Sequence, residues 1–129
     1  GFTGITDENG NVIFTLPEGS YRFRADKNGE RFFSSGTDAC TVPNCWMANI
    51  TVPQFDSVTV TITDTLGIIQ PDIPVYAFDG TTYTGYGAVT DESGQAVFLM
   101  HEGNYRFRAD VNGLQYLSGT ENHCIVIGC

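Results

Sequence analysis

Four cysteines are the residues of this chain whose spacing points most directly to chemistry. Cys40 and Cys45 are separated by four residues, and so are Cys124 and Cys129. An even number of cysteines in paired frames is typical of disulfides, which form in oxidising, extracellular compartments. The sequence therefore predicts a short disulfide-closed loop in each half of the chain.

Metal binding is the competing interpretation of the cysteines, because His123 stands directly before Cys124. A closed structural zinc site needs four ligands, and each frame supplies only two cysteines. The first frame has Ala39 at the place that corresponds to His123. The spacing favours disulfides, and we expect no metal and no cofactor.

Oxygen ligands of the kind that Ca²⁺ prefers occur in two short stretches, at Asp7, Glu8 and Asn9 and at Asp91 and Glu92. The full calcium-loop pattern D-x-[DN]-x-[DN]-G is absent. Both stretches, DENG and DESG, run from aspartate to glycine. Aspartate caps its own backbone and glycine accepts positive φ, so we expect plain turns here rather than calcium sites.

Catalytic constellations are missing from the sequence. There is no Ser/His/Asp order, nucleophile elbow, phosphate-binding loop or paired acid/base motif. His101 falls in a predicted turn, and Pro17 takes its place in the other half of the chain. We therefore expect a protein that is not an enzyme.

Arginine occurs in two pairs, Arg22 with Arg24 and Arg106 with Arg108, each inside the phrase YRFRAD. Alternate side chains of a strand share a face, so each pair predicts an arginine stripe. The stripe either docks an acidic neighbour, such as the next subunit, or pairs across strands with carboxylates of its own domain. The second interpretation is favoured, and the first keeps the four arginines as candidate interface residues.

Several groups are candidates for surface roles. Asn49 begins the triplet Asn-Ile-Thr, which matches the acceptor pattern for N-glycosylation. The aromatic residues Trp46, Phe55, Tyr83 and Tyr86 are candidates to stack on sugars or to pack in an interface. Trp46 follows a cysteine frame and precedes a linker, so we expect it to pack between domains or subunits.

The strands that are expected to position these residues occur in two similar copies along the sequence. Shifted by 84 positions, the chain aligns with itself without a gap, and both cysteine frames coincide. Of the 45 pairs from Gly1/Gly85 to Cys45/Cys129, 20 are identical. The sequence therefore predicts a duplicated domain with a period of 84 residues.

Period-two alternation of apolar and polar residues predicts strands, and no segment has a helical period. Asn28-Gly29 and Asn112-Gly113 indicate hairpin turns. Short strands with turns every eight to twelve residues are typical of an antiparallel β-sandwich, and no segment can serve as the crossover helix of a parallel sheet. The predicted strands of the second half are SVTVTITD at 57–64, PVYAF at 74–78, TYTGYGAVT at 82–90, QAVFLM at 95–100, YRFRAD at 105–110 and LQYLS at 114–118.

The phase of the repeat predicts two incomplete domains. Residues 1–52 form a partial β-sandwich repeat without its first strands, and WMANITV at 46–52 is its last strand. Residues 53–56 form a linker. Residues 57–129 form a second repeat that lacks the strand after the last cysteine. No signal peptide is visible, so we expect an internal or mature segment.

Charge excludes several partners. The net charge is −9 and the isoelectric point is about 4.3. Nucleic-acid backbones and anionic membrane surfaces both require an excess of Lys and Arg. No apolar run approaches the roughly 20 residues of a membrane span. We expect neither nucleic acid as a partner nor insertion into a membrane.

A shared motif carries a family resemblance. The pattern T-D-x-x-G-x-x-x-F-x-x-x-x-G-x-Y-x-F occurs at Thr6–Phe23 and again at Thr90–Phe107. With VTVTITDTLG and PVYAFDG ahead of the second copy, it resembles the carboxypeptidase-regulatory-like and Cna-B-type repeats. The resemblance implies a transthyretin-like (prealbumin-like), Ig-like β-sandwich, used in tandem as stalk or adhesin modules on prokaryotic surfaces or as accessory domains beside enzymes.

One feature departs from that family. Many Cna-B-type domains lock themselves with a Lys–Asn isopeptide bond. Residues 46–129 contain no lysine, and the only lysine, Lys27, lies on a predicted turn. We expect the cysteine pair to replace that covalent lock.

These observations lead to one main hypothesis and two alternatives. The main hypothesis is an extracellular, non-enzymatic repeat protein of a surface stalk, fibre or filament, whose partners are neighbouring repeats or subunits of its own kind. Each cut domain is then completed by an adjacent repeat or by a strand from a neighbouring subunit. The alternatives are an adhesin-type module for a surface glycan or host protein, and an accessory domain of a secreted hydrolase.

Overall fold

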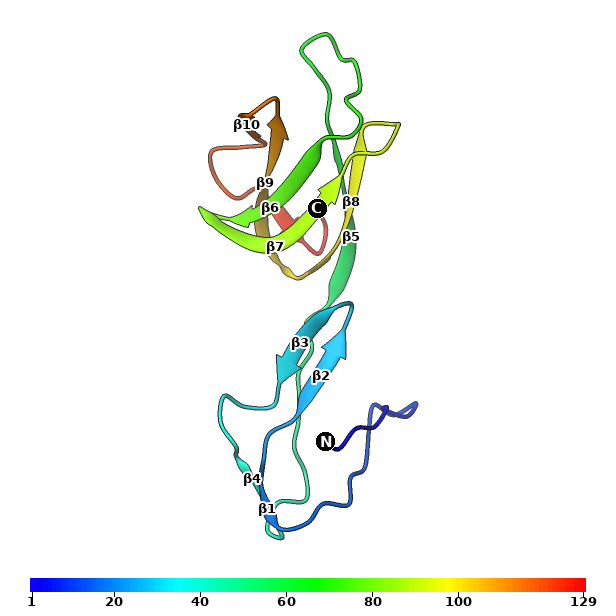
Figure 1. The fold of residues 1–129 in the computed structure, drawn as a ribbon, viewed down its shortest axis with the longest axis vertical. Coiled ribbons are helices and arrows are strands. Elements are labelled where there is room, and N and C mark those ends of the chain that lie inside the picture. The colour runs from blue at the N-terminus through cyan, green and yellow to red at the C-terminus, as the bar shows by residue number, and fades with distance from the viewer. The chain divides into compact units, whose positions relative to one another are not determined.

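The computed structural model describes residues 1–129 (Figure 1). The chain forms eleven β-strands, joined by turns and irregular segments, and no helix. Every strand pair is antiparallel. The all-β, antiparallel prediction is therefore confirmed. The chain divides into two compact units, Gly1–Val52 (unit 1) and Pro53–Cys129 (unit 2), and each is described by itself. No helix is present that is long and apolar enough to cross a membrane.

Unit 2 contains two sheets. One has the order β10-β9-β6-β7, with β11 beside the first residues of β9, and the other is the pair β5-β8. The strands are β5 (Phe55–Thr61), β6 (Pro74–Asp79), β7 (Thr82–Val89), β8 (Gln95–His101), β9 (Gly103–Val111), β10 (Leu114–Leu117) and β11 (Cys124–Val126).

The core of unit 2 follows from period-two alternation. Ala96, Phe98 and Met100 on β8 are buried, while the residues between them are exposed. On β9 the buried residues include Tyr105, Phe107 and Ala109. The rings of Phe98 and Phe107 lie 5.4 Å apart and join the two sheets in one cluster. Burial of this face drives the unit to fold.

The turns predicted at Asp-x-x-Gly and Asn-Gly form where the sequence places them, whereas His101, expected in a turn, is the last residue of β8. Asp91 accepts hydrogen bonds from the backbone N–H groups of Ser93 and Gln95 and so closes the turn before β8. Asn112, with φ of 51°, and Gly113, with φ of 80°, join β9 to β10. Left-handed conformations of this kind are what Asn-Gly supplies to a hairpin.

Unit 1 consists of two strand pairs, β1-β4 and β2-β3. The register of β1 with β4 begins with Gly19 opposite Val42, and that of β9 with β11 has Gly103 opposite Val126, so both partners are 84 positions later. The pairs of β2 with β3 correspond in the same way to those of β9 with β10. The strands are β1 (Gly19–Tyr21), β2 (Arg24–Lys27), β3 (Glu30–Phe33) and β4 (Cys40–Val42).

Two expectations about strands need correction. Residues 46–52, expected as a last strand, contain no strand, because no strand of unit 1 pairs with them. Alternation of apolar and polar residues suits a segment to a sheet, but a strand forms only where a neighbouring strand accepts and donates its backbone hydrogen bonds. At the other boundary, β5 begins at Phe55 and not at Ser57, so it includes the second half of the expected linker.

Candidate functional site

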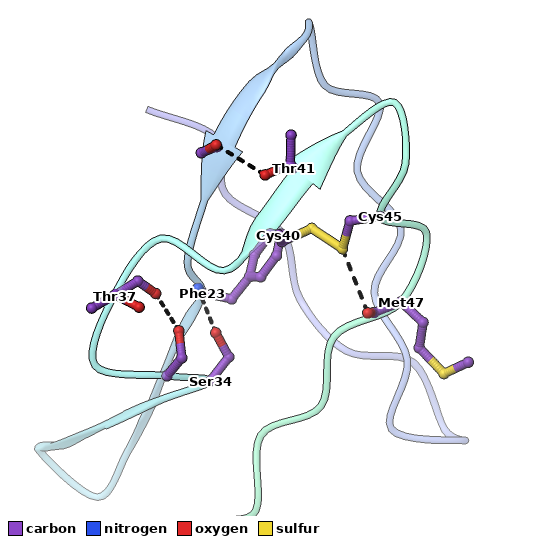
Figure 2. The surroundings of a disulfide bond; sticks show 9 residues. Phe23, Ser34, Thr37, Cys40, Thr41, Cys45 and Met47 are labelled. Atoms are coloured by element: carbon purple, nitrogen blue, oxygen red, sulfur yellow. Dashed lines mark hydrogen bonds between the residues drawn. A yellow bond between two sulfur atoms is a disulfide. The ribbon is translucent and has the colours of Figure 1, made fainter.

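The four cysteines form two disulfides within their frames, Cys40–Cys45 and Cys124–Cys129, and no cysteine is free. Figure 2 shows the first of them, which joins Cys40, the first residue of β4, to Cys45 beyond the end of the strand. In each loop the second cysteine donates its backbone N–H to the carbonyl one residue after the first cysteine. Each bond therefore fastens a tight turn, and no thiolate is left to bind a metal.

The acidic stretches are capped turns. Asp7 Oδ1 accepts the backbone N–H groups of Asn9 and Asn11, as Asp91 does for Ser93 and Gln95. No three side chains of the His, Cys, Asp and Glu types gather where they can share a metal ion. The first carboxylate of each stretch is thus used by its own backbone.

A serine–histidine pair is the closest approach to nucleophilic chemistry, and the sequence analysis missed it. Ser118 Oγ lies 2.6 Å from His123 Nε2 and also accepts the backbone N–H of Phe107. Ser34 makes the same bond to Phe23 in unit 1, where no histidine is available (Figure 2). Ser118 therefore serves to hold β9 and the end of β10 together.

His101 belongs to an aromatic cluster that includes the core residue Tyr105 and Tyr86, which packs against the core. Its Nδ1 lies 2.6 Å from the hydroxyl of Tyr86, and its carbonyl accepts the hydroxyl of Tyr105 at 2.7 Å. The ring of Phe55 stands edge-on to the imidazole at 6.1 Å. Tyr86 and Phe55 are half-buried here, so these two aromatic candidates act in packing within unit 2.

The arginines are engaged inside their own units. Arg106 donates to the carbonyls of Gly80, Gly119 and Thr120, at 2.8, 3.3 and 2.8 Å. Arg108 forms an ion pair of 2.8 Å with Asp110. This carboxylate lies two residues further along the same strand, whereas the sequence analysis expected a partner across the sheet.

Unit 1 has a related arrangement. Arg24 pairs with Asp26 at 2.8 Å. The guanidinium of Arg22 lies 4.5 Å above the ring of Phe33, and it donates to the carbonyl of Gly36 at 3.3 Å. A cation over a ring face is attracted by the ring quadrupole, so Arg22, which lies between β1 and β2, is also engaged within its own unit.

An aromatic cluster covers the outer face of the large sheet in unit 2. The ring of Tyr83 lies 5.6 Å from Tyr76 and 5.7 Å from Phe78, and Arg108 stands over the latter two rings. A side chain at Gly87 would meet Tyr76 and Tyr83, which explains the glycine. Beside the cluster is a hollow of about 250 Å³, lined by Phe78, Thr81, Arg106, Arg108, Gln115 and Leu117.

Residues 46–52 carry the remaining surface candidates. Trp46 is 96% exposed and Asn49 is exposed as well. The sulfur of Cys45 lies 3.6 Å from the carbonyl oxygen of Met47 (dashed in Figure 2), but it belongs to the disulfide and has no proton to donate, so this contact is not a hydrogen bond. The structure thus presents Trp46 and the glycosylation triplet on a backbone without a partner.

A second hollow of unit 2, larger than the one beside the aromatic cluster, is an open groove that the sequence analysis missed. Its volume is about 560 Å³, and core residues such as Val75, Phe107 and Ala109 form its floor. Leu114 and Tyr116 belong to the core-facing side of β10, yet they are 59% and 55% exposed. No short stretch of the sequence signals the groove, because it depends on how many strands of the opposing sheet cover β10.

Comparisons with protein-family models, with curated proteins and with solved structures found no match to this chain. The resemblance to Cna-B-type repeats therefore stays a prediction.

Proposed function

We propose that this chain is part of an extracellular structural protein built from tandem β-sandwich repeats. The repeats have a period of 84 residues and the transthyretin-like fold that the sequence motif implies. Joined in a row they form a stalk, fibre or filament on a prokaryotic cell surface. The partners of each repeat are its neighbours, and no enzymatic step is involved.

The observation that carries this proposal is the agreement in detail between the two units. Beyond the strand registers, Tyr21 donates its hydroxyl to the carbonyl of Pro17, and Tyr105 does the same to His101. Disulfides of equal spacing close equivalent loops. Matching hydrogen bonds and matching disulfides in the two units are what a repeated structural module requires.

Both units also leave core-type surface uncovered. Phe23 is half-buried, whereas its counterpart Phe107 is 4% exposed. Apart from Cys40, no hydrophobic residue of unit 1 is buried. Exposed apolar surface beside open strand edges promotes association. This favours modules that are completed by an adjacent repeat or by a strand from a neighbouring subunit.

Immunogold labelling of intact cells that make the protein tests this function. Antibodies against the 129-residue chain are expected to mark linear surface structures at regular intervals. Label confined to the cell interior, or released as a soluble species with hydrolase activity, would rule out a structural surface role.

A second function, recognition of a glycan, is favoured by the outer-face cluster. Tyr83 is 48% exposed beside the hollow that Arg106 and Gln115 line, and aromatic rings with nearby polar groups suit sugars. A glycan array probed with the full chain tests it. Binding that disappears in Tyr83→Ala and persists in Tyr116→Ala would support this candidate, and an array without signal would exclude it.

A further inference from the structure

The groove of unit 2 exists because its two sheets differ in width. The large sheet has four strands in a row, whereas the opposing sheet has only β5 and β8. Two strands cannot cover the inner face of four, and the uncovered part lies under β10. There the side chains of Val111, Leu114 and Tyr116 face inward without a layer above them.

An unpaired strand edge borders the same groove. β5 pairs with β8 along one edge, and no strand pairs with its other edge. The lining comes from Val60 and Thr61 at the end of β5 and the residues that follow on one side, and from β9 and β10 on the other, over Val75 of β6, while β8 contributes none. At this end of β5 the unpaired edge therefore lies where one additional strand would also cover the apolar floor.

Residues 46–52 have the properties of such a strand. Trp46, Ala48, Ile50 and Val52 occupy alternate positions and share one face of an extended chain. The segment is seven residues long, as is β5. Its backbone forms no hydrogen bond to another backbone group, so its donors and acceptors are available for a ladder.

Charge and chain geometry favour a second copy as the source of this strand. The segment carries no charged residue, and the groove has one, Asp64, so contact avoids the repulsion expected between chains of net charge −9. In the same chain only Pro53 and Gln54 separate the segment from β5. A two-residue hairpin requires glycine or asparagine with positive φ, which this pair does not supply.

We propose that the groove between β5 and β10 is a strand-acceptor site for residues 46–52 of a second copy of this chain. The inserted segment pairs with the free edge of β5. Its face of Trp46, Ala48, Ile50 and Val52 covers the floor at Phe107 and Ala109 and the side chain of Tyr116. This proposal rests on the structural function proposed above and specifies the joint between neighbours.

Complementation between two variants of the full chain tests the proposal. Ile50→Asp places a charge on the apolar face of the donor segment and leaves the groove intact, and Tyr116→Asp places a charge in the groove and leaves the donor intact. Sedimentation velocity over a concentration series is expected to show self-association for the native sequence. Each variant alone is weakened at least ~10-fold, and a mixture of the two gives a one-to-one dimer that grows no further.

Two matched variants serve as controls. Asn49→Asp and Gln115→Asp place the same charge on the opposite faces of the donor segment and of β10, so both are expected to associate like the native chain. Circular dichroism of all four variants checks that they fold, and Tyr116 and Ile50 lie outside the buried core, so folding is expected to persist.

Three results would overturn the proposal. One is a native chain that stays monomeric at every concentration. Another is association that survives both Ile50→Asp and Tyr116→Asp, because the joint would then lie elsewhere. The third is a mixture that forms no heterodimer. None of these three results changes the outcome expected from immunogold labelling of cells. The proposal of an acceptor site can therefore fail while the proposed structural function still stands.

Discussion

At the scale of single residues, the same amino acid has different consequences in the two units. Gly10 and Gly94 end equivalent turns with φ of 78° and 74°. A side chain at Gly10 would meet open space, whereas one at Gly94 would lie 2.9 Å from Ile69 and 3.0 Å from the carbonyl of Ile62. Sequence predicted both turns, but not which of them another loop covers.

The glycine pair yields a direct prediction. Gly94→Ala is expected to lower the free energy of unfolding of unit 2 by about 2–4 kcal/mol, because left-handed strain and overpacking add. Gly10→Ala is expected to lower that of unit 1 by about 1–2 kcal/mol, from strain alone. Hydrogen exchange of each unit in the full chain measures both values. Equal losses at the two sites would contradict the packing of the loop on Gly94.

At the scale of elements, the strands that pair locally were predictable and those that need distant partners were not. The hairpin of β9 and β10 and the turn at Asp91 follow from local residue types, since Asn-Gly and Asp-x-x-Gly fix the backbone within a few positions. Residues 46–52 alternate as well as β8 does, yet β8 is a strand because β5 lies beside it. Alternation of apolar and polar residues specifies which side chains share the buried face of a strand, but it does not specify which strand pairs with it.

Among the candidate sites, too, those formed by residues close in sequence were predictable and those formed by distant residues were not. The disulfides were predictable because the cysteine frames are local. The groove was not, because it depends on how many strands oppose β9 and β10, which no short stretch encodes. The contact between Ser118 and His123 joins residues of a loop whose path the sequence leaves open.

Core burial gives a second prediction, at the level of strands. Phe107→Ala on β9 is expected to destabilise unit 2 by about 3–5 kcal/mol, because the ring is 4% exposed and contacts Phe98. Phe23→Ala removes the equivalent, half-buried ring of unit 1 and is expected to cost less than half as much. Chemical denaturation with exchange read for each unit distinguishes them. A similar loss in both units would show that unit 1 buries Phe23 as deeply as unit 2 buries Phe107.

The disulfide at the end of unit 2 gives a third prediction. Cys124 and Cys129 are five positions apart, so the closed loop is short and chain entropy predicts about 2 kcal/mol of stabilisation. Replacing both by alanine is expected to remove at least that amount, since Cys124 is also fully buried. Faster exchange should be confined first to β11 and the start of β9, which it pairs with. Unchanged stability would mean that the bond does not fasten β11.

At the scale of the whole molecule, each of the two units leaves apolar surface uncovered. Unit 2 has an open groove beside a free edge, and unit 1 leaves most of its aromatic side chains partly exposed. In the structural array proposed above, the surface that one module leaves open would be covered by the next.

The most direct test compares hydrogen exchange in the native surface assembly with exchange in the dissociated 129-residue chain. The amides of β5 that do not pair with β8 are expected to exchange at least ~100-fold more slowly in the assembly, because a neighbouring strand accepts their hydrogen bonds. Those on the β8 side are expected to be protected in both states and serve as the internal reference. Equal exchange of the free-edge amides in both samples would contradict the account, since the modules would then stand uncompleted in their native setting.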